Sequence, residues 1–514
     1  MLSSIFGKKS DHPMADMKSA QALLDDLPRN DAHKMIMELT EWIESVADNA
    51  DFKPDHQFAV VRLLDETAQP HARKLARDYF TPQALNRFQE NRLWLVLGNW
   101  SHHTARAYLK VFDRYCSGDK GASAIRTQAP LLAARAVYAV TAELKYICAR
   151  YGPVDNMIWS SLARIYQHAE QQQYQDTPLV LYPGASGNTT VKAELGRLLG
   201  WYGCGVNTLK PLQMHLTERI IGQYCSSMEI SAQQHANSLF SFDLNRPAAP
   251  VWVKAGSAAH PSMRFVSMEA MQSKLAALIK TLEKGAVPED LNLGGLYDAE
   301  LVREVAQYLL NYLTAPPSRR SARRGIKVGL SVVNGFDRMI ERTELALNFG
   351  AEQPAHWDIE DISAGGFRTV LPAQGADDIR IGNLLGVQPD GVPHWGAAVV
   401  RRLMRDDANQ LHVGTEMLTN QIAGVALSQS GGGGGGGFED GQLALWLQAK
   451  PGDSSGEARL LMKADTFSPH RSLQTQLEGR NYLLIPIGLQ EKGNDYDLAR
   501  FRLIEQEGSP EEAC

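Results

Sequence analysis

Apolar positions in about the first 230 residues recur every three to four residues, which is the spacing of amphipathic helices. In one such segment Met35, Leu39 and Val46 fall on one face. Asn30 or Asp31 precedes this segment and is suited to cap it, because short polar side chains accept hydrogen bonds from the first free N–H groups of a helix. The pattern therefore predicts a series of helices at the N-terminus.

Helix start and stop signals support this interpretation. Thr81 and Pro82 form an N-cap and first-position pair, which predicts a helix beginning there. The apolar run 129–152 ends at Gly152 and Pro153, a common helix stop. No fixed repeat relates the segments, so we expect an irregular helical bundle with a short β-like interruption between about residues 248 and 268. Further helices are predicted over 155–173, 191–203, 211–225, 268–285 and 299–313.

The pattern changes at Ala315, Pro316 and Pro317. Short segments rich in Val and Ile follow, separated by turn residues, which is typical of β-strands. Seven strands within little more than a hundred residues predict a small antiparallel barrel or sandwich. These strands are expected over 326–333, 356–362, 367–372, 381–388, 395–404, 411–418 and 422–429.

Seven consecutive glycines, Gly431 to Gly437, interrupt the strands and are expected to form a flexible loop or linker. Additional strands are predicted over 442–450, 457–465, 481–488 and 498–505. The fold class is therefore multidomain α+β, with an irregular all-α bundle before an antiparallel barrel and additional strands. The expected divisions are an all-helical domain at 1–235, a helical continuation with a β interruption at 236–315, the barrel at 316–430, the glycine-rich linker or loop at 431–440, a further β-rich module at 441–506 and a disordered tail at 507–514.

Composition narrows the functional classes. The chain has 514 residues and a net charge of −6, which gives no reason to expect DNA or RNA as a partner. Its five cysteines are scattered without a CxxC pair, and its first residues lack the apolar core of a signal peptide. No stretch approaches the ~20 apolar residues of a membrane span. We therefore expect a cytoplasmic protein without membrane insertion.

One short segment is strongly basic. Residues 318–327 contain Arg319, Arg320, Arg323, Arg324 and Lys327 and no acidic residue. The planar guanidinium group can pair with phosphate or with the O6 and N7 edge of guanine, and it can stack on a base. The segment is therefore a candidate anion-binding site, although composition alone favours a solvated interdomain linker.

A second candidate motif follows about forty residues later, at the end of a predicted strand. It consists of Asp361, Ser363, Gly365 and Gly366. The aspartate can accept a guanine N–H group or orient an arginine, the serine offers a hydroxyl to phosphate, and glycine lets the backbone approach a flat ligand. Taken alone, Asp361 and Ser363 favour a β-turn with a side-chain bond to the backbone, whereas together with the arginines they favour a binding site.

The two motifs in this order resemble the PilZ family, which binds cyclic di-GMP through an RxxxR segment and a (D/N)xSxxG strand motif. Arg320 and Arg324 fit the first motif, and Arg319 and Arg323 fit it equally well in spacing. Asp361 begins the match to the second motif, which its serine and second glycine complete position by position. The hairpin over 395–418 also looks like the family's closing strands, so the resemblance covers residues 316–430.

The resemblance implies a bacterial cyclic di-GMP receptor without enzymatic activity and without a cofactor. The arginine segment would close over the barrel face that carries the second motif, and this movement would change how the helical domain and the barrel are arranged. A protein partner would then read the signal through the helical domain. By analogy with the family, the output would be regulation of motility or biofilm formation.

Two alternatives stay open. The segment 334–350 between the motifs reads as an inserted helix, which would suit a degenerate PilZ-like adaptor that binds protein and no nucleotide. The other alternative is an enzyme in the helical domain, which a deep pocket with convergent ionisable residues between about 80 and 230 would support. The sequence itself shows no catalytic constellation, and His102, His103 and His215 lack partners at metal-binding spacing.

Overall fold

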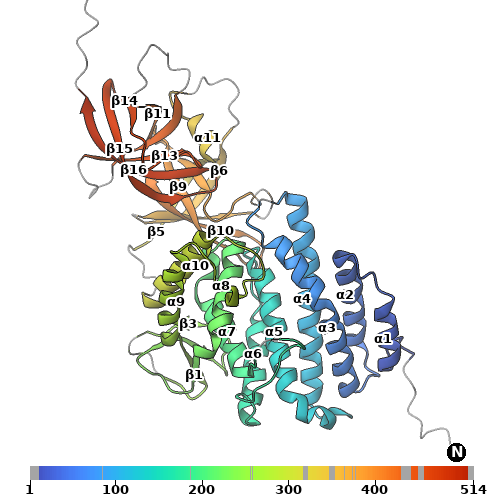
Figure 1. The fold of residues 1–514 in the computed structure, drawn as a ribbon. Helices are drawn as coiled ribbons and strands as arrows, with labels where there is room; N and C mark the ends of the chain where they lie inside the picture. Colours follow the sequence, from blue (N-terminus) through green and yellow to red (C-terminus); the bar gives the residue numbers. More distant parts are fainter. Residues whose placement is uncertain are drawn as a thin grey trace, which may run out of the picture. The chain divides into compact units, whose positions relative to one another are not determined.

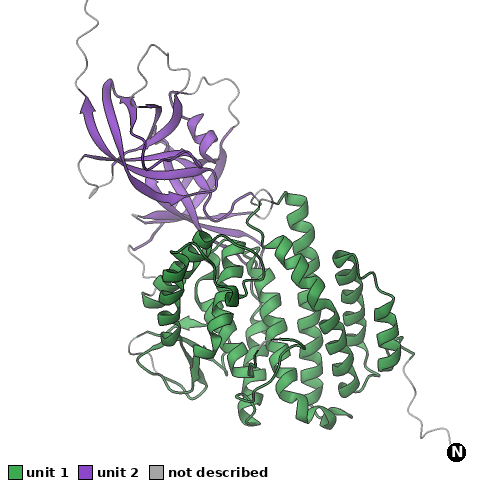
Figure 2. Cartoon of the chain, in the orientation of Figure 1, with its two compact units in different colours: residues 1–317 green, residues 318–514 purple. Residues whose placement is uncertain are grey.

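Helices occupy most of the chain up to Thr314, and strands dominate after it (Figure 1). The chain divides into two compact units, residues 1–317 and 318–514 (Figure 2). The computed structural model describes residues 11–83, 85–185, 187–254, 256, 259–315, 322–345, 353–363, 365–372, 374, 376, 378–429, 441–449 and 456–506. The expected order of helices first and antiparallel strands second is confirmed.

The first unit is built mainly of α-helices that pack side by side. Helices α2, α3 and α4 contact one another, α4 contacts α5, and α5 contacts α6, α7 and α8. Their bounds are α1 (Met17–Asp25), α2 (Ala32–Asp48), α3 (Pro54–Tyr79), α4 (Arg87–Cys116), α5 (Ala129–Cys148), α6 (Asn156–Gln171), α7 (Val191–Gly203), α8 (Pro211–Tyr224), α9 (Glu269–Leu282) and α10 (Ala299–Thr314). Short 3₁₀ turns η1 (Ala122–Gln128), η2 (Val206–Thr208), η3 (Cys225–Ser227) and η4 (Glu289–Leu291) join some of them.

Local capping decides where several helices begin. The Asp31 carboxylate accepts the N–H groups of His33 and Lys34 at 3.0 and 3.1 Å and so starts α2. The prediction that a helix begins at Thr81 and Pro82 is wrong, because α4 begins at Arg87. The reason lies in Asn86 and Gln89, whose side chains bond reciprocally to each other's backbone N–H groups and form a capping box.

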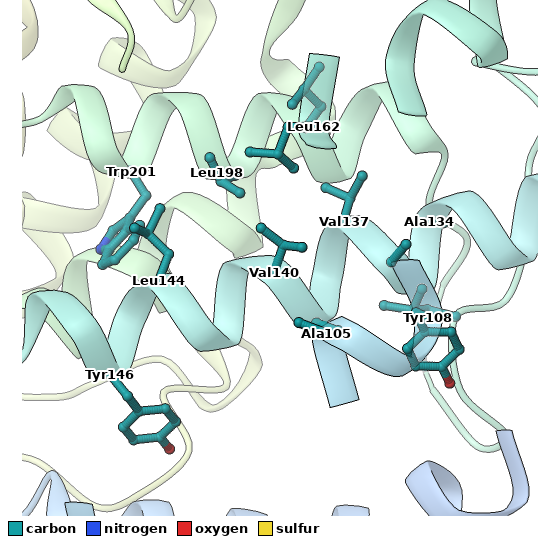
Figure 3. Packing of buried hydrophobic residues seen from close by; sticks show 14 of the residues in the cluster. Ala105, Tyr108, Ala134, Val137, Val140, Leu144, Tyr146, Leu162, Leu198 and Trp201 are labelled. Atoms are coloured by element: carbon teal, nitrogen blue, oxygen red, sulfur yellow. The ribbon is translucent and has the colours of Figure 1, made fainter. Parts of the chain in front are cut away.

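The interior of the helical unit is a continuous apolar core. Val137 and Val140 of α5 face Leu162 of α6 and Leu198 of α7, and all four side chains are fully buried (Figure 3). Trp201 of α7 is also fully buried, and its indole N–H donates to the Met214 carbonyl at 3.0 Å. Buried aromatic groups with a satisfied polar atom fix the packing of neighbouring helices.

The β-like interruption of the sequence is a small antiparallel sheet in the order β1-β4-β2-β3. Phe240 and Phe242 on β2 and Val266 on β4 are buried and belong to the core of the helical unit. The sheet therefore extends the helical unit and is not a separate domain. Its strands are β1 (Glu229–Ser231), β2 (Ser238–Asp243), β3 (Val251–Trp252) and β4 (Met263–Ser267).

The second unit contains two closed antiparallel barrels. The first has the strand order β10-β7-β6-β5-β8-β9, and the second has the order β11-β12-β13-β16-β15-β14. The strands of the first are β5 (Arg324–Asn334), β6 (Ala355–Ser363), β7 (Gly366–Leu371), β8 (Leu384–Pro389), β9 (Gly396–Arg405) and β10 (Leu411–Thr419). Those of the second are β11 (Ile422–Gln429), β12 (Gln442–Leu447), β13 (Glu457–Lys463), β14 (Leu473–Leu477), β15 (Arg480–Lys492) and β16 (Tyr496–Gln506).

The pairing of β11 differs from the sequence expectation. The sequence pattern places the segment 422–429 in the first barrel, but the strand pairs with β12 and β14 and so belongs to the second. The first barrel closes without it, because β10 pairs with both β7 and β9. Four strands of this barrel lie where the sequence predicts strands after the glycine run, and β11 and β14 complete it. Strand β14 was not predicted from the sequence.

The helix in the segment between the two motifs is shorter than expected. Helix α11 spans Phe336–Ile340, whereas the sequence predicts a helix over 334–350. Phe336, Met339 and Ile340 on α11 pack into a core shared by strands of both barrels, so the insertion lies within the β unit. Residues 346–352, the glycine run and the tail 507–514 lie outside the described residues.

None of the helices in the described part of the chain has the length and apolar character needed to cross a bilayer.

Candidate ligand-binding site of the first barrel

The two predicted motifs meet on neighbouring strands of the first barrel. Strands β5 and β6 pair with Gly325 opposite Asp361 and Arg324 opposite Ile362. The end of the basic segment thus lies beside the DxSxxG motif, although the two are far apart in sequence. Arg319 and Arg320 lie outside the described residues.

Asp361 is the centre of an ion-pair cluster. Arg323 places Nη1 2.9 Å from Oδ1 of Asp361, and Arg368 places Nε 3.0 Å from Oδ2. The carboxylate side chain is 16% exposed, whereas each arginine side chain is 40% exposed. A largely shielded carboxylate therefore orients two more accessible guanidinium groups.

Arg368 was not among the residues singled out from the sequence. It lies on β7, directly opposite Asp361 in the hairpin that joins β6 to β7, and it also pairs with Glu360 at 2.7 Å. A sequence signal for it exists. If Ser363 pairs with Gly366 across a two-residue turn, counting back along both strands places residue 368 opposite residue 361.

The start of β5 presents a mixed basic and apolar surface. Arg324 and Lys327 are exposed, and the side chains of Ile326 and Ile362 are 40% and 39% exposed. The pairing register shifts between Gly325 and Val328, which is a β-bulge. Exposed apolar side chains can pack against a flat base, and the neighbouring arginines can pair with its phosphate.

The serine and the second glycine of the motif already have local roles. The Ser363 hydroxyl donates to the Gly366 carbonyl at 3.2 Å. A Cβ atom on Gly366 would lie 1.9 Å from the Thr415 carbonyl oxygen, so β7 and β10 approach closely only because residue 366 is glycine. A Cβ atom on Gly365 would meet nothing within 4 Å. The motif therefore forms the turn that its residues favour, and the space beside Gly365 is open.

The closing hairpin lies directly against the motif strand. Gly414 on β10 pairs with Arg368 on β7, and Val413 is fully buried. Glu416 accepts from Nε of Arg401 at 2.8 Å. Val413, Gly414 and Glu416 therefore help to close the barrel beside Asp361.

The helical unit contains a separate cleft of about 1340 Å³ among α3, α4, α5, α7, α8 and the segment 287–297. Such a pocket is the feature that would support the enzyme alternative. Lys145, Arg197 and Glu218 form its buried charged wall, with Lys145 Nζ 3.0 Å from Glu218 Oε2 and Arg197 also paired to Glu218. Burial alone would raise the pKa of Glu218, but Arg197 and Lys145 outweigh it and hold that pKa well below its usual range.

His215 lies in the same wall with both ring nitrogens bonded. Nε2 donates to the Leu293 carbonyl at 2.9 Å, so Nδ1 is the unprotonated nitrogen and accepts from Lys145 Nζ at 2.8 Å. Burial, and then the neighbouring Lys145, lower the pKa of His215 well below its usual value. The ionisable groups of this wall therefore bond to one another, and these bonds fix the shape of the wall.

Comparison with known families gives one match. Residues 18–235 match the family model described as "Cyclic-di-GMP receptor FimW, N-terminal domain". The match covers α1 to α8 and the first strand of the small sheet, so it falls on the helical unit and not on the barrel that carries the two motifs. No curated protein matches the chain at a significant level.

Proposed function

We propose that the chain is a cyclic di-GMP receptor and that the ligand binds where the start of β5 meets the turn between β6 and β7. The observation that carries this proposal is the pairing of Gly325 with Asp361, which brings the basic segment beside the DxSxxG motif. The match of residues 18–235 to a domain of a cyclic di-GMP receptor supports it independently, because it rests on a different part of the chain.

The chemistry of the ligand suits the residues present. Cyclic di-GMP carries two phosphates and two guanines. Arginine pairs with both groups, through charge-assisted bonds to phosphate and a bidentate contact with the O6 and N7 edge of guanine. On binding, Arg323 would exchange part of its contact with Asp361 for the ligand, and Asp361 would accept guanine N–H groups. Ile326 and Ile362 would cover the base.

Ligand binding would signal through the connection between the units. Helix α10 ends at Thr314 and β5 begins at Arg324, so the arginine segment is itself the connection. Contact of this segment with the ligand would change how the helical unit and the barrels are arranged, and a protein partner would respond through the helical unit. In this proposal the protein is a cytoplasmic receptor without catalytic activity, with an output in motility or biofilm regulation.

Calorimetric titration of the full chain with cyclic di-GMP tests the proposal, with GTP as the control ligand. We expect micromolar or tighter binding that the double substitution Arg320→Ala and Arg324→Ala abolishes. Arg502→Ala, which removes an exposed arginine from β16 of the other barrel, is the matched control and should bind normally. Absence of binding to the intact chain, or equal loss in the control, would refute the proposal.

A second candidate is a PilZ-like adaptor that binds protein and no nucleotide. It is favoured by the local roles of Ser363 and Gly366, which account for both residues without a ligand. This candidate predicts that a partner captured by the full chain is retained equally with and without cyclic di-GMP and in the Arg324→Ala variant. A partner gained or lost on addition of the nucleotide would count against it.

A further inference from the structure

We propose that the cleft of the helical unit is a docking site for an acidic peptide segment of a partner protein, with an apolar residue beside its acids. The inference deepens the proposed function, and it rests on that function in assigning partner recognition to the helical unit. Four features of the cleft carry it: its rim charges, its paired interior acids, an exposed leucine and its size.

The rim of the cleft is basic. Arg73 and Arg77 lie one helical turn apart on α3, and both are exposed. Within the described part of the chain neither has an ion pair. Arg219 on α8 also lines the cleft and uses its Nε to donate to the Asn292 carbonyl at 2.9 Å. Against these three cations stands one exposed acid of the rim, Glu289.

The acids inside the cleft are already paired. Asp65 accepts from the hydroxyls of Tyr108 and Tyr182 at 2.7 and 2.9 Å and lies 3.4 Å from Nη1 of Arg135. Glu218 is held between Lys145 and Arg197. An incoming carboxylate would therefore meet the unpaired arginines of the rim without strong repulsion from the wall.

An exposed leucine adjoins the basic rim. Leu296 is 99% exposed, although its neighbours are anchored. The Tyr297 hydroxyl donates to the Phe80 carbonyl at 3.1 Å, and Leu293 is buried and bonded to His215. A single exposed leucine is common on protein surfaces. This one stands on an anchored segment that lines the same cleft as the three arginines, which suits a partner that is both acidic and apolar.

The size of the cleft suits a peptide segment. Its volume of about 1340 Å³ exceeds the ~300–1,000 Å³ of sites for single small molecules and leaves room for several residues.

Selection of random peptides displayed on phage against the full chain tests the proposal. We expect enrichment of sequences that combine Asp or Glu with an apolar residue. A synthetic peptide of the enriched sequence should bind about tenfold or more weakly to the Arg73→Glu, Arg77→Glu variant. The matched control is Arg126→Glu, Arg246→Glu, which makes the same charge change at exposed positions outside the cleft and should bind normally.

A second variant separates the apolar contact from the charges. Binding of the peptide to the unchanged protein should weaken as the salt concentration rises. Leu296→Ser should lower the affinity for the same peptide but leave this dependence on salt unchanged. No enrichment, enrichment without acidic bias, or equal loss in the control variant would overturn the proposal. So would stabilisation of the chain by citrate without peptide binding, which would indicate a site for small anions.

The peptide selection is carried out without nucleotide, so its result does not depend on cyclic di-GMP binding. If peptides bind but calorimetry shows no nucleotide binding, the cleft assignment stands and the receptor proposal fails. If the nucleotide binds but no peptide is selected, only the cleft assignment fails.

Discussion

Arg401 on β9 of the first barrel donates to both carboxylate oxygens of Glu491 on β15 of the second, at 2.7 and 2.6 Å. The Tyr496 hydroxyl donates to the same carboxylate at 2.7 Å, and Arg401 also bonds Glu416 within its own barrel. This bidentate pair lies within the β unit, where side chains from both barrels form a common apolar core. The two barrels are therefore joined by packing and by an oriented ion pair.

Glu491→Gln should loosen this junction, because a neutral amide presents only one acceptor to the guanidinium fork. The side chains of Arg401 and Glu491 are 37% and 27% exposed, so solvent screening limits the expected loss to about 1–2 kcal/mol. Hydrogen exchange of the β9 and β15 amides measures it. The control Glu505→Gln acts on an exposed pair with Arg480 at 3.5 Å, and its effect should stay below about 0.5 kcal/mol. If Glu491→Gln and Glu505→Gln change hydrogen exchange equally, the ion pair between Arg401 and Glu491 does not specifically stabilise the junction of the two barrels.

The two barrels show which features of the fold are determined by residues close together in the sequence and which are not. Caps such as Asp31 and the order of helices and strands follow from residues close in sequence, and these were predicted. The membership of β11 was not, because alternating apolar residues identify a strand but not its partner. Its pairing with β14 joins Ser428 to Gln474, far along the chain, and such long-range contacts leave no local pattern.

The Gly366→Ala substitution should destabilise the first barrel strongly. A Cβ atom at this position would lie 1.9 Å from the Thr415 carbonyl oxygen, so β7 or β10 must shift. We expect a loss of about 3 kcal/mol or more, measured by urea unfolding of the full chain. Gly365→Ala is the control, since a methyl group there would meet nothing within 4 Å and the fold should keep its stability. A stable Gly366→Ala protein would contradict the close approach of the strands.

The candidate site was predictable only where its residues form a motif. Asp361 and Ser363 were found because they belong to a recognisable pattern, whereas Arg368 becomes visible only when the hairpin register is worked out. The cleft of the helical unit was not found at all. Its wall combines Lys145 of α5, Arg197 of α7 and Glu218 of α8, whose meeting depends on helix packing and not on spacing along the chain.

Asp361→Asn should weaken cyclic di-GMP binding by about tenfold or more, because the neutral amide no longer orients Arg323 and Arg368 and no longer offers a charged acceptor to guanine. Calorimetry of the full chain measures the change. Asp358→Asn is the matched control on the same strand, since its side chain is 90% exposed. If both variants bind the nucleotide like the unchanged protein, Asp361 has only a structural role.

His215 provides a pH test of the cleft wall. Burial and Lys145 lower its pKa well below the usual value, so the folded protein keeps it neutral while the unfolded chain takes up a proton near about pH 6.5. Its contribution to stability is therefore fully present above that pH and is lost as pH falls below it. The loss approaches about 1.4 kcal/mol per pH unit between about pH 6 and about pH 5.

His215→Gln should reduce this acid sensitivity of the helical unit, because glutamine cannot take up a proton in the unfolded chain. Its amide N–H can still donate to the Leu293 carbonyl, and its carbonyl can accept from Lys145. Urea unfolding at several pH values between about 7 and about 5 measures the slope, above the range where Glu218 begins to take up protons in the unfolded chain. The exposed His235→Gln variant should keep the slope of the unchanged protein. Equal slopes for both variants would show that His215 is not held neutral by the fold.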